Sequence, residues 1–314
     1  MTQPRASVNG PLFVLCVVAL AACSQSNTLG GGSGDGGNGD GGSGDGASLG
    51  DGAAGFDGAT LGDGGTLGDG GGPSAEVCDG LDNDGNGIVD DVDVGHDGVC
   101  DCLSIATLGI PGEWGEGNVF ATWLDARSDS GATNLADAVL TSELLAPFQV
   151  IVIQDIRGRA YSNAEVSALQ GWIENGGGLM TLIGYGNPDE RTNVNTLLAP
   201  TGIQYDSAQI LQGQPMTLPI RTWHTHPVSD MITQVGVDNG YEVIGGGTVI
   251  AEEMGYDVLR ATTLGSGHVL VWGDEWITYN SEWEGRPEFQ VERFWVNSIK
   301  WLTPAAECQV PILF

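Results

Sequence analysis

The sequence predicts an α/β domain over residues 103–314, in which a mostly parallel sheet carries helices on its faces. Residues 149–154 form a β-branched run typical of a buried strand, and residues 179–183 form a second apolar run. Between them, residues 162–174 place apolar side chains at helical spacing. A strand, a helix and a strand in this order make a βαβ unit, whose two strands lie parallel in one sheet.

The predicted helix has sequence signals at both of its ends. Ser162 occupies the N-cap position, and Glu165 three residues later completes a capping box. The run from Asn175 to Gly178, which contains three glycines, ends the helix. Other segments of the domain show similar apolar patterns. We expect further strands at 104–108, 241–244, 248–251, 258–262 and 268–272, and a closing helix at 289–302.

The first residues of the chain predict export rather than a membrane span. One basic residue, Arg5, precedes an apolar run from 11 to 23 that is too short to cross a hydrocarbon core of ~30 Å, so residues 1–22 read as a signal peptide. The run ends in Leu-Ala-Ala-Cys, which resembles the bacterial lipobox. The resemblance implies an acyl anchor on Cys23 that holds the chain in the cell envelope, at the outer membrane or cell surface. The alternative is an ordinary signal peptide, which still exports the chain.

Residues 23–75 predict a disordered linker behind this N-terminus. Gly, Asp and Ser dominate the stretch from 30 to 72, which has almost no apolar surface to bury. The whole chain has 41 acidic and 10 basic residues and a net charge of −31. Because phosphate binding needs clustered cations, this charge excludes nucleic acid as a partner.

Residues 76–102 form an acidic module with the clearest metal-binding pattern of the chain. With Asp82 at the first position of a twelve-residue calcium loop, oxygen ligands fall at alternate positions and Gly87 permits the sharp bend. Calcium suits so many hard oxygen ligands better than a transition metal does. We expect a structural Ca²⁺, and the alternative is an acidic turn without an ion. The predicted ligands are Asp82, Asp84, Asn86, Ile88, Asp90 and Asp93.

The acidic module resembles two kinds of known loop. No long helices flank it, so it is similar to the isolated Asp-rich loops of thrombospondin type 3 repeats and dockerins. The segment from Glu76 to Asp84 resembles the MopE-type metal-binding motif of secreted bacterial proteins. That family has a second cysteine where this chain has Gly85, a departure that puts copper in doubt more than calcium.

Four cysteines lie beyond the lipobox. In an oxidising compartment an even number indicates disulfides, and three pairings are possible. We favour Cys78 with Cys100, which closes the acidic module, and Cys102 with Cys308, which joins the two ends of the large domain. A thiolate metal site is the alternative, and it is disfavoured because the chain has no C-x-x-C pair.

Four stretches of the large domain carry a family resemblance, namely 148–155, 169–179, 265–274 and 297–302. Together they resemble the class I glutamine amidotransferase-like fold, which implies a flavodoxin-like sheet. The matching residues are strand patterns and glycines, so they indicate a fold rather than an activity. Catalytic members of the family have a cysteine at the turn where this chain has Tyr185, and the accompanying His-x-Glu pair is also missing. We therefore expect no glutaminase activity.

A candidate site lies beyond the strand at 268–272, because open α/β sheets bind ligands at the carboxyl ends of their strands. Its aromatic residues could bind a sugar face or a cation, or could simply pack the loop. His224 and His226 stand two apart and could supply two metal ligands, but a turn beginning at His226 is the commoner arrangement. The candidates for acid, base or metal-ligand roles are Asp155, Asp274, Glu275 and His226. The candidates for ligand binding are Tyr185, Trp276, Tyr279 and Trp283.

These features predict a surface lipoprotein with a calcium-stiffened stalk. Its amidotransferase-like domain would be non-catalytic and would bind a glycan, a peptide or a partner protein. The alternative is a hydrolase that acts on envelope or extracellular polymers through acidic or histidine residues. Paired acids with room for water, or converging histidines, would favour the hydrolase. An apolar-aromatic groove without perturbed acids would favour the binding domain.

Overall fold

The computed structural model describes residues 75–112, 115–184, 188–212, 217–304 and 308. The predicted signal peptide, the Cys23 anchor and nearly all of the linker lie outside the described residues, as does Tyr185. Within the described ranges, no helix has the length and apolar character needed to cross a membrane.

An eight-stranded sheet forms the centre of the α/β domain, in the order β2-β1-β3-β4-β12-β11-β10-β7. Strands from β2 to β12 pair in parallel, and strands from β12 to β7 pair antiparallel. The parallel part has the 2-1-3-4-5 order of flavodoxin-like sheets, which confirms the predicted fold class. The strands are β1 (Ile105–Gly109), β2 (Thr133–Asn134), β3 (Val150–Gln154), β4 (Gly178–Thr181), β7 (Thr222–Trp223), β10 (Thr248–Glu253), β11 (Tyr256–Leu264) and β12 (Gly267–Trp272).

The predicted βαβ unit is present as β3, α3 (Asn163–Glu174) and β4. The two strands are parallel neighbours, with Val150 opposite Gly178. The predicted capping box has formed, since the Ser162 hydroxyl accepts from the backbone N–H of Glu165 and the Glu165 carboxylate accepts from the N–H of Ser162. The local signals at Ser162 therefore determine where this helix begins.

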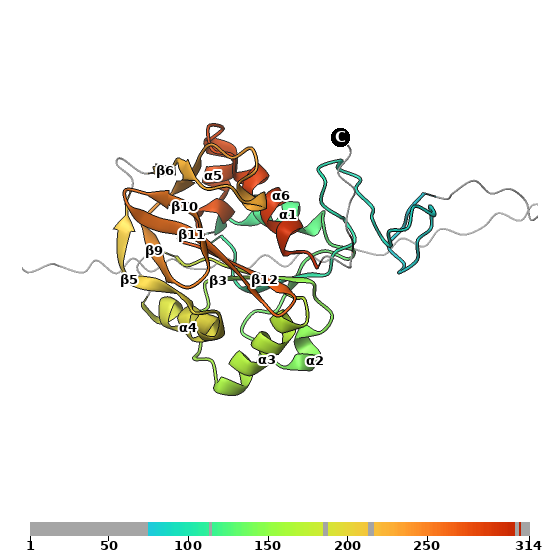
Figure 1. The fold of residues 1–314 in the computed structure, drawn as a ribbon, viewed down its shortest axis with the longest axis horizontal. Coiled ribbons are helices and arrows are strands. Elements are labelled where there is room, and N and C mark those ends of the chain that lie inside the picture. The colour runs from blue at the N-terminus through green and yellow to red at the C-terminus, as the bar shows by residue number, and fades with distance from the viewer. Residues whose placement is uncertain (1–74, 113–114, 185–187, 213–216, 305–307, 309–314) are drawn as a thin grey trace, which may run out of the picture. The chain divides into compact units, whose positions relative to one another are not determined.

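Both faces of the sheet are covered by helices (Figure 1). On one face, α1 (Asn118–Asp125) and α6 (Val291–Leu302) bury Phe120, Phe294 and Trp295. On the other face, α2 (Ser142–Leu145), α3 and α4 (Pro188–Leu198) bury residues such as Leu169 and Val194. Alternate residues of β3 enter the two separate cores, which explains why this strand is apolar throughout.

Two small ribbons lie outside the main sheet. The strand predicted at 241–244 exists as β9, but it pairs with β5 rather than joining the large sheet. A second ribbon joins β6 and β8. The remaining elements are β5 (Ile203–Leu211), β6 (Leu218–Ile220), β8 (Val235–Val237), β9 (Gly240–Gly245), α5 (Asn280–Gly285) and the short 3-10 helices η2 (Ala199–Thr201), η3 (Pro227–Ser229) and η4 (Trp276–Thr278).

The acidic module, residues 76–102, contains no helix or strand. Its C-terminal part nevertheless contacts the α/β domain, because Val99 and Cys100 are buried in the core that contains α1 and α6. Asp97 forms an ion pair with Arg127, whose guanidinium lies 3.8 Å from the ring centroid of Trp123. These contacts join the end of the module to the helical layer of the domain.

Candidate functional site

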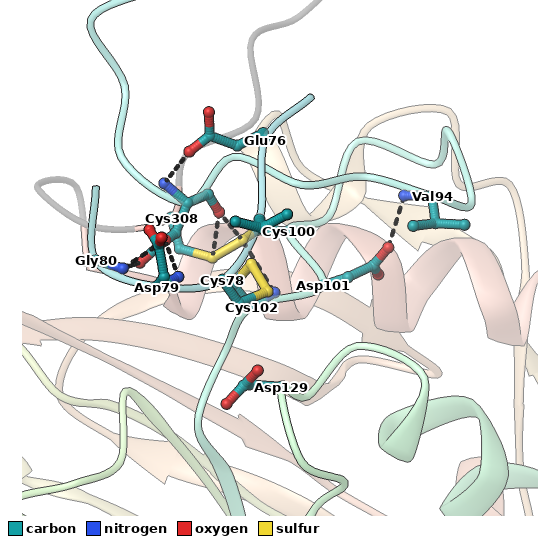
Figure 2. The surroundings of a disulfide bond; sticks show 12 residues. Glu76, Cys78, Asp79, Gly80, Val94, Cys100, Asp101, Cys102, Asp129 and Cys308 are labelled. Atoms are coloured by element: carbon teal, nitrogen blue, oxygen red, sulfur yellow. Dashed lines mark hydrogen bonds between the residues drawn. A yellow bond between two sulfur atoms is a disulfide. The ribbon is translucent and has the colours of Figure 1, made fainter. Parts of the chain in front are cut away.

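The four described cysteines form two disulfides, and the predicted pairing is wrong. Cys78 pairs with Cys102, and Cys100 pairs with Cys308, with Cα separations of 5.3 Å and 5.6 Å (Figure 2). The physical reason is the direction of the Cys100 side chain, which is buried in the core together with Cys308, whereas Cys78 and Cys102 are only partly buried. Cys100 and Cys102 stand two apart in the sequence, and their sulfurs and that of Cys308 all lie within 4.8 Å of one another. Spacing along the chain therefore could not show which of the two pairs with Cys308.

Backbone N–H groups of the acidic module point to its carboxylates. Asp82 accepts from the N–H groups of Gly85 (2.7 Å) and Gly87 (2.8 Å). Glu76 accepts from the N–H groups of Asp84 (3.0 Å) and Asp90 (3.1 Å), which ties the start of the module to its middle. Short-range hydrogen bonds, rather than a core, thus hold these carboxylates in place.

Three acids of the module are grouped closely enough to hold a metal ion. Oxygens of Glu76, Asp84 and Asp91 lie within 4.8 Å of one another. Of the predicted ligands, only Asp84 belongs to this group. Asp90 accepts from the N–H of Gly80 instead, and Asp93 accepts from the N–H groups of Asp97 and Gly98. The described structure therefore gathers a different set of acids from the one predicted by the twelve-residue loop.

A second group of carboxylates lies at the carboxyl ends of β3, β4 and β12. Asp155 follows β3 in a left-handed conformation (φ 55°), and its N–H donates to Glu190 of α4 at 2.6 Å. The N–H of Gly184, beyond β4, donates to the other oxygen of Glu190 at 2.9 Å. Gly184 must lack a side chain, because a Cβ would collide with the carboxylate of Glu275. We refer to Asp155, Glu190 and Glu275 as the carboxylate network.

Glu275 is the centre of this network, and neutral side chains donate to it. Gln154 Nε2 donates to one of its oxygens at 3.1 Å, and the Tyr279 hydroxyl donates to the other at 2.8 Å. The neighbouring Asp274 is also buried, and it accepts from the N–H groups of Asp238 and Glu275. The predicted acids Asp155, Asp274 and Glu275 are therefore brought together, largely by hydrogen bonds within the protein.

Burial perturbs the protonation of the carboxylate network. Burial, reinforced by the charge of Glu275, raises the pKa of Glu190 to about 8. The same two causes raise the pKa of Asp155 to about 6, although Arg157 contacts its carboxylate. Burial also raises the pKa of Asp274 well above its usual range. Glu190 therefore holds its proton to a higher pH than an exposed glutamate does.

The predicted aromatic residues do not form one exposed binding face. Tyr279 is buried, and Trp283 packs against Phe120 and Trp123 at ring separations of 6.2 Å and 5.7 Å. Trp276 is partly buried, and its indole N–H donates to Ser281 at 3.2 Å. Tyr279 and Trp283 therefore anchor the loop, as the alternative interpretation expected.

His226 lies apart from the carboxylate network. Its Nδ1 accepts from the N–H of Val228 at 3.2 Å, so His226 caps the 3-10 helix η3. Its ring contacts Trp301, which stacks on His268 at the opposite end of β12 from Asp274. The interpretation of His226 as the start of a turn is confirmed.

A groove of about 440 Å³ follows the edge of the sheet, between α1 and the strands β1 and β2. The groove was not predicted from the sequence. The pattern that could have indicated it is the glycine-rich stretch 109–117, which connects a buried strand to a helix. The volume and the mixture of apolar and polar walls suit a small ligand. Its lining includes Thr107, Ile110, Gly112, Gly117, Asn118, Phe120, Ala121, Leu124, Asp125, Ala132 and Asn134.

The chain matches no protein-family model and no curated protein. It is similar in structure to the cytoplasmic protein STM1381 from Salmonella typhimurium LT2, with a TM-score of 0.52 and 17% identity over 64% of this chain and 100% of that one. The mmIFT52 N-terminal domain has a TM-score of 0.51 and 15% identity over 63% and 96%. A ThuA-like protein from Bacteroides uniformis ATCC 8492 has a TM-score of 0.41 and 12% identity over 63% and 91%. At these identities the similarity concerns the fold, and the first two structures agree with the α/β architecture described above.

The disulfide pairing can be tested by mass spectrometry of the unreduced chain. A protease that cleaves before aspartate separates Cys100 from Cys102, because Asp101 lies between them. We expect linked peptides that join Cys78 to Cys102 and Cys100 to Cys308, and their loss after reduction. Linkage of Cys78 to Cys100 would contradict the structure and restore the pairing favoured from the sequence.

The carboxylate network predicts that the melting temperature falls as the pH rises from 5 to 8. A carboxyl whose pKa is raised in the folded state stabilises the fold fully below its unfolded pKa, and this contribution is lost as the pH rises through the folded value. The stabilising contribution of Asp155 is therefore lost between the ordinary pKa of 3.8 and the raised pKa of about 6. The contribution of Glu190 is lost between 4.5 and about 8. For the buried Glu190, each unit of raised pKa corresponds to about 1.4 kcal/mol, and solvent screening makes the contribution of Asp155 smaller.

The Glu275→Gln variant should flatten this pH dependence, because the charge of Glu275 raises both pKa values. Gln154 can accommodate the new amide, since its buried Oε1 has no hydrogen-bond partner within the described structure and can accept. The exposed Glu284→Gln is the matched control and should leave the slope unchanged. An unchanged slope in Glu275→Gln would show that the network does not govern the pH response.

Proposed function

We propose that this chain is an envelope lipoprotein whose α/β domain binds a ligand and does not catalyse glutamine hydrolysis. The groove beside α1 is the observation that carries the proposal, because it combines a volume of about 440 Å³ with apolar walls and a few polar groups. Two further observations support it. The sequence has Tyr185 where catalytic members of the amidotransferase-like family have a cysteine, and the acids beyond the strand ends are hydrogen-bonded within the protein.

The proposed location rests on the lipobox-like residues before Cys23. An acyl group on this cysteine would anchor the chain in the outer membrane or at the cell surface. The linker of residues 23–75, as a Gly-rich coil, would have a root-mean-square reach of about 40 Å. This reach would hold the binding domain clear of the lipid headgroups. The ligand would be a glycan, a peptide or a partner protein.

A structural calcium ion in the acidic module is part of the same proposal. The resemblance to MopE-type and thrombospondin type 3 loops supports it, as does the group of oxygens from Glu76, Asp84 and Asp91. Three carboxylates around one point suit a hard divalent cation. The ion would neutralise charge in a segment that has no helix or strand.

A hydrolase remains the second candidate function, and the raised pKa values of Asp155 and Glu190 favour it. A carboxyl group that is protonated near neutral pH can act as a general acid, and its ionised neighbour can act as a base. These groups are contributed by the ends of β3 and α4, where α/β sheets place their ligands. Hydrolysis of an envelope polymer that Asp155→Asn abolishes, with Asp129→Asn as control, would favour this function over the binding proposal.

Binding can be tested with the full chain, purified in detergent, on glycan and peptide arrays. We expect a ligand whose binding is lost in Ala121→Trp, because the large ring would fill the groove. Ala126→Trp is the matched control, since Ala126 is also exposed, at the end of the same helix, but does not line the groove. If no ligand binds, or if both variants bind equally well, the proposal fails.

The calcium site can be tested by calorimetry of the full chain and three variants. We expect about one ion per chain, and loss of binding in Asp84→Asn, which belongs to both candidate ligand sets. Asp91→Asn should weaken binding about tenfold or more if the grouped acids are the ligands, because each lost carboxylate lowers calcium affinity. If the ligands are instead those of the twelve-residue loop, Asp93→Asn should weaken calcium binding and Asp91→Asn should not. Absence of binding by the unmodified chain would refute the calcium proposal.

A further inference from the structure

The polar groups of the groove are separated into two ends. Asn118 and Asn134 lie at the carboxyl edge of the sheet, where α1 begins and β2 ends. Asp125 lies at the other end, at the last residue of α1. Asn118 and Asp125 are seven positions apart in α1, so at 1.5 Å of rise per residue the two ends are about 10 Å apart. The groove is therefore elongated and differs in charge along its length.

The hydrogen bonds within the protein indicate what each end offers a ligand. The Oδ1 atoms of Asn118 and Asn134 already accept, from Asn280 and from the N–H of Ala136, so the groups that these two lining residues have left to offer a ligand are their amide N–H donors. Asp125 Oδ1 accepts from the N–H of Ala132 at 2.9 Å, and the described residues supply no donor to Oδ2. One end therefore offers donors, and the other offers a carboxylate oxygen.

The middle of the groove is apolar. Phe120 and Leu124 are buried beneath it, while Ala121 and Ala132 provide small side chains. Gly112, which also lines the groove, has a positive φ (67°), and a Cβ there would collide with the backbone of Gly117. A ligand therefore meets mainly apolar walls between its two polar ends.

We propose that this groove binds a short peptide of about three residues, with its free amino group at Asp125 and its carboxylate at Asn118 and Asn134. An extended chain spans about 3.3–3.6 Å per residue, so three residues match the 10 Å between the ends. The dipole of α1 has its positive end near the ligand carboxylate and its negative end near the ligand ammonium. This inference rests on the proposed binding function and selects peptide from the three ligand classes.

Charge distinguishes this ligand from the other classes. The only charged residue that lines the groove within the described structure is Asp125, and the chain as a whole carries a net charge of −31. Both features attract an ammonium group, and a neutral glycan offers none. The carboxylate of the peptide is tolerated because it lies at the opposite end, beside amide donors.

The test is calorimetry of the full chain with Ala-Ala-Ala and with N-acetyl-Ala-Ala-Ala. We expect one tripeptide per chain and binding about tenfold or more weaker after acetylation, because a charge-assisted hydrogen bond is lost. Asp125→Asn keeps the acceptor for Ala132, so it should fold normally and should weaken binding of the free tripeptide to the same extent. It should leave binding of the acetylated peptide unchanged. Asp129→Asn, an exposed acid outside the groove, is the control and should bind like the unmodified chain.

Other outcomes separate this inference from the proposed function. Equal binding of the free and acetylated peptides, or no effect of Asp125→Asn, would overturn the inference. If the tripeptide does not bind but an array ligand binds and is lost in Ala121→Trp, the peptide assignment fails and the binding function stands. If neither binds, both fail.

Discussion

Burial of the central strands on both faces is the constraint on which the rest of the structure depends. Val150 and Val152 of β3 enter one core, and Ile151 and Ile153 enter the other. The acidic side chains that follow these strands lie beyond the strand ends, where the chain leaves the sheet. This constraint gathers Gln154, Asp155, Gly184, Asp274 and Glu275 at a single edge.

Burying several acids side by side costs free energy of folding, and it changes the pKa values of these acids. Like charges at short range cannot all ionise without loss of stability, so burial and Glu275 raise the pKa values of Asp155 and Glu190. Hydrogen bonds from backbone N–H groups, Gln154 and Tyr279 offset part of this cost. The network therefore joins β3, α4 and the segment after β12, and the same arrangement would serve acid-base chemistry if a substrate reached it.

Features that depend on local sequence were predictable, and features that depend on distant partners were not. The buried strand β3, the capping box at Ser162 and the closing helix α6 follow from patterns within a few residues. Cys100 and Cys102 stand two apart, and their partners depend on which of them faces the core. Glu190 sits in a helix with little apolar pattern, so nothing in the sequence placed it beside Asp155. The edge of the sheet was predictable as a location, whereas the members of the site were not.

The groove and the carboxylate network have different physical origins. The network forms because β3, β4 and β12 end side by side, and its described residues are hydrogen-bonded to one another and to nearby N–H groups. The groove exists because the sheet ends early, since β2 has only two residues and both are exposed. Phe120, Trp123 and Leu124 of α1 are buried against the core, whereas Ala121 and Asp125 of the same helix are exposed and line the groove. No further strand pairs with β2 within the described structure, so the space beside α1 stays open to a ligand.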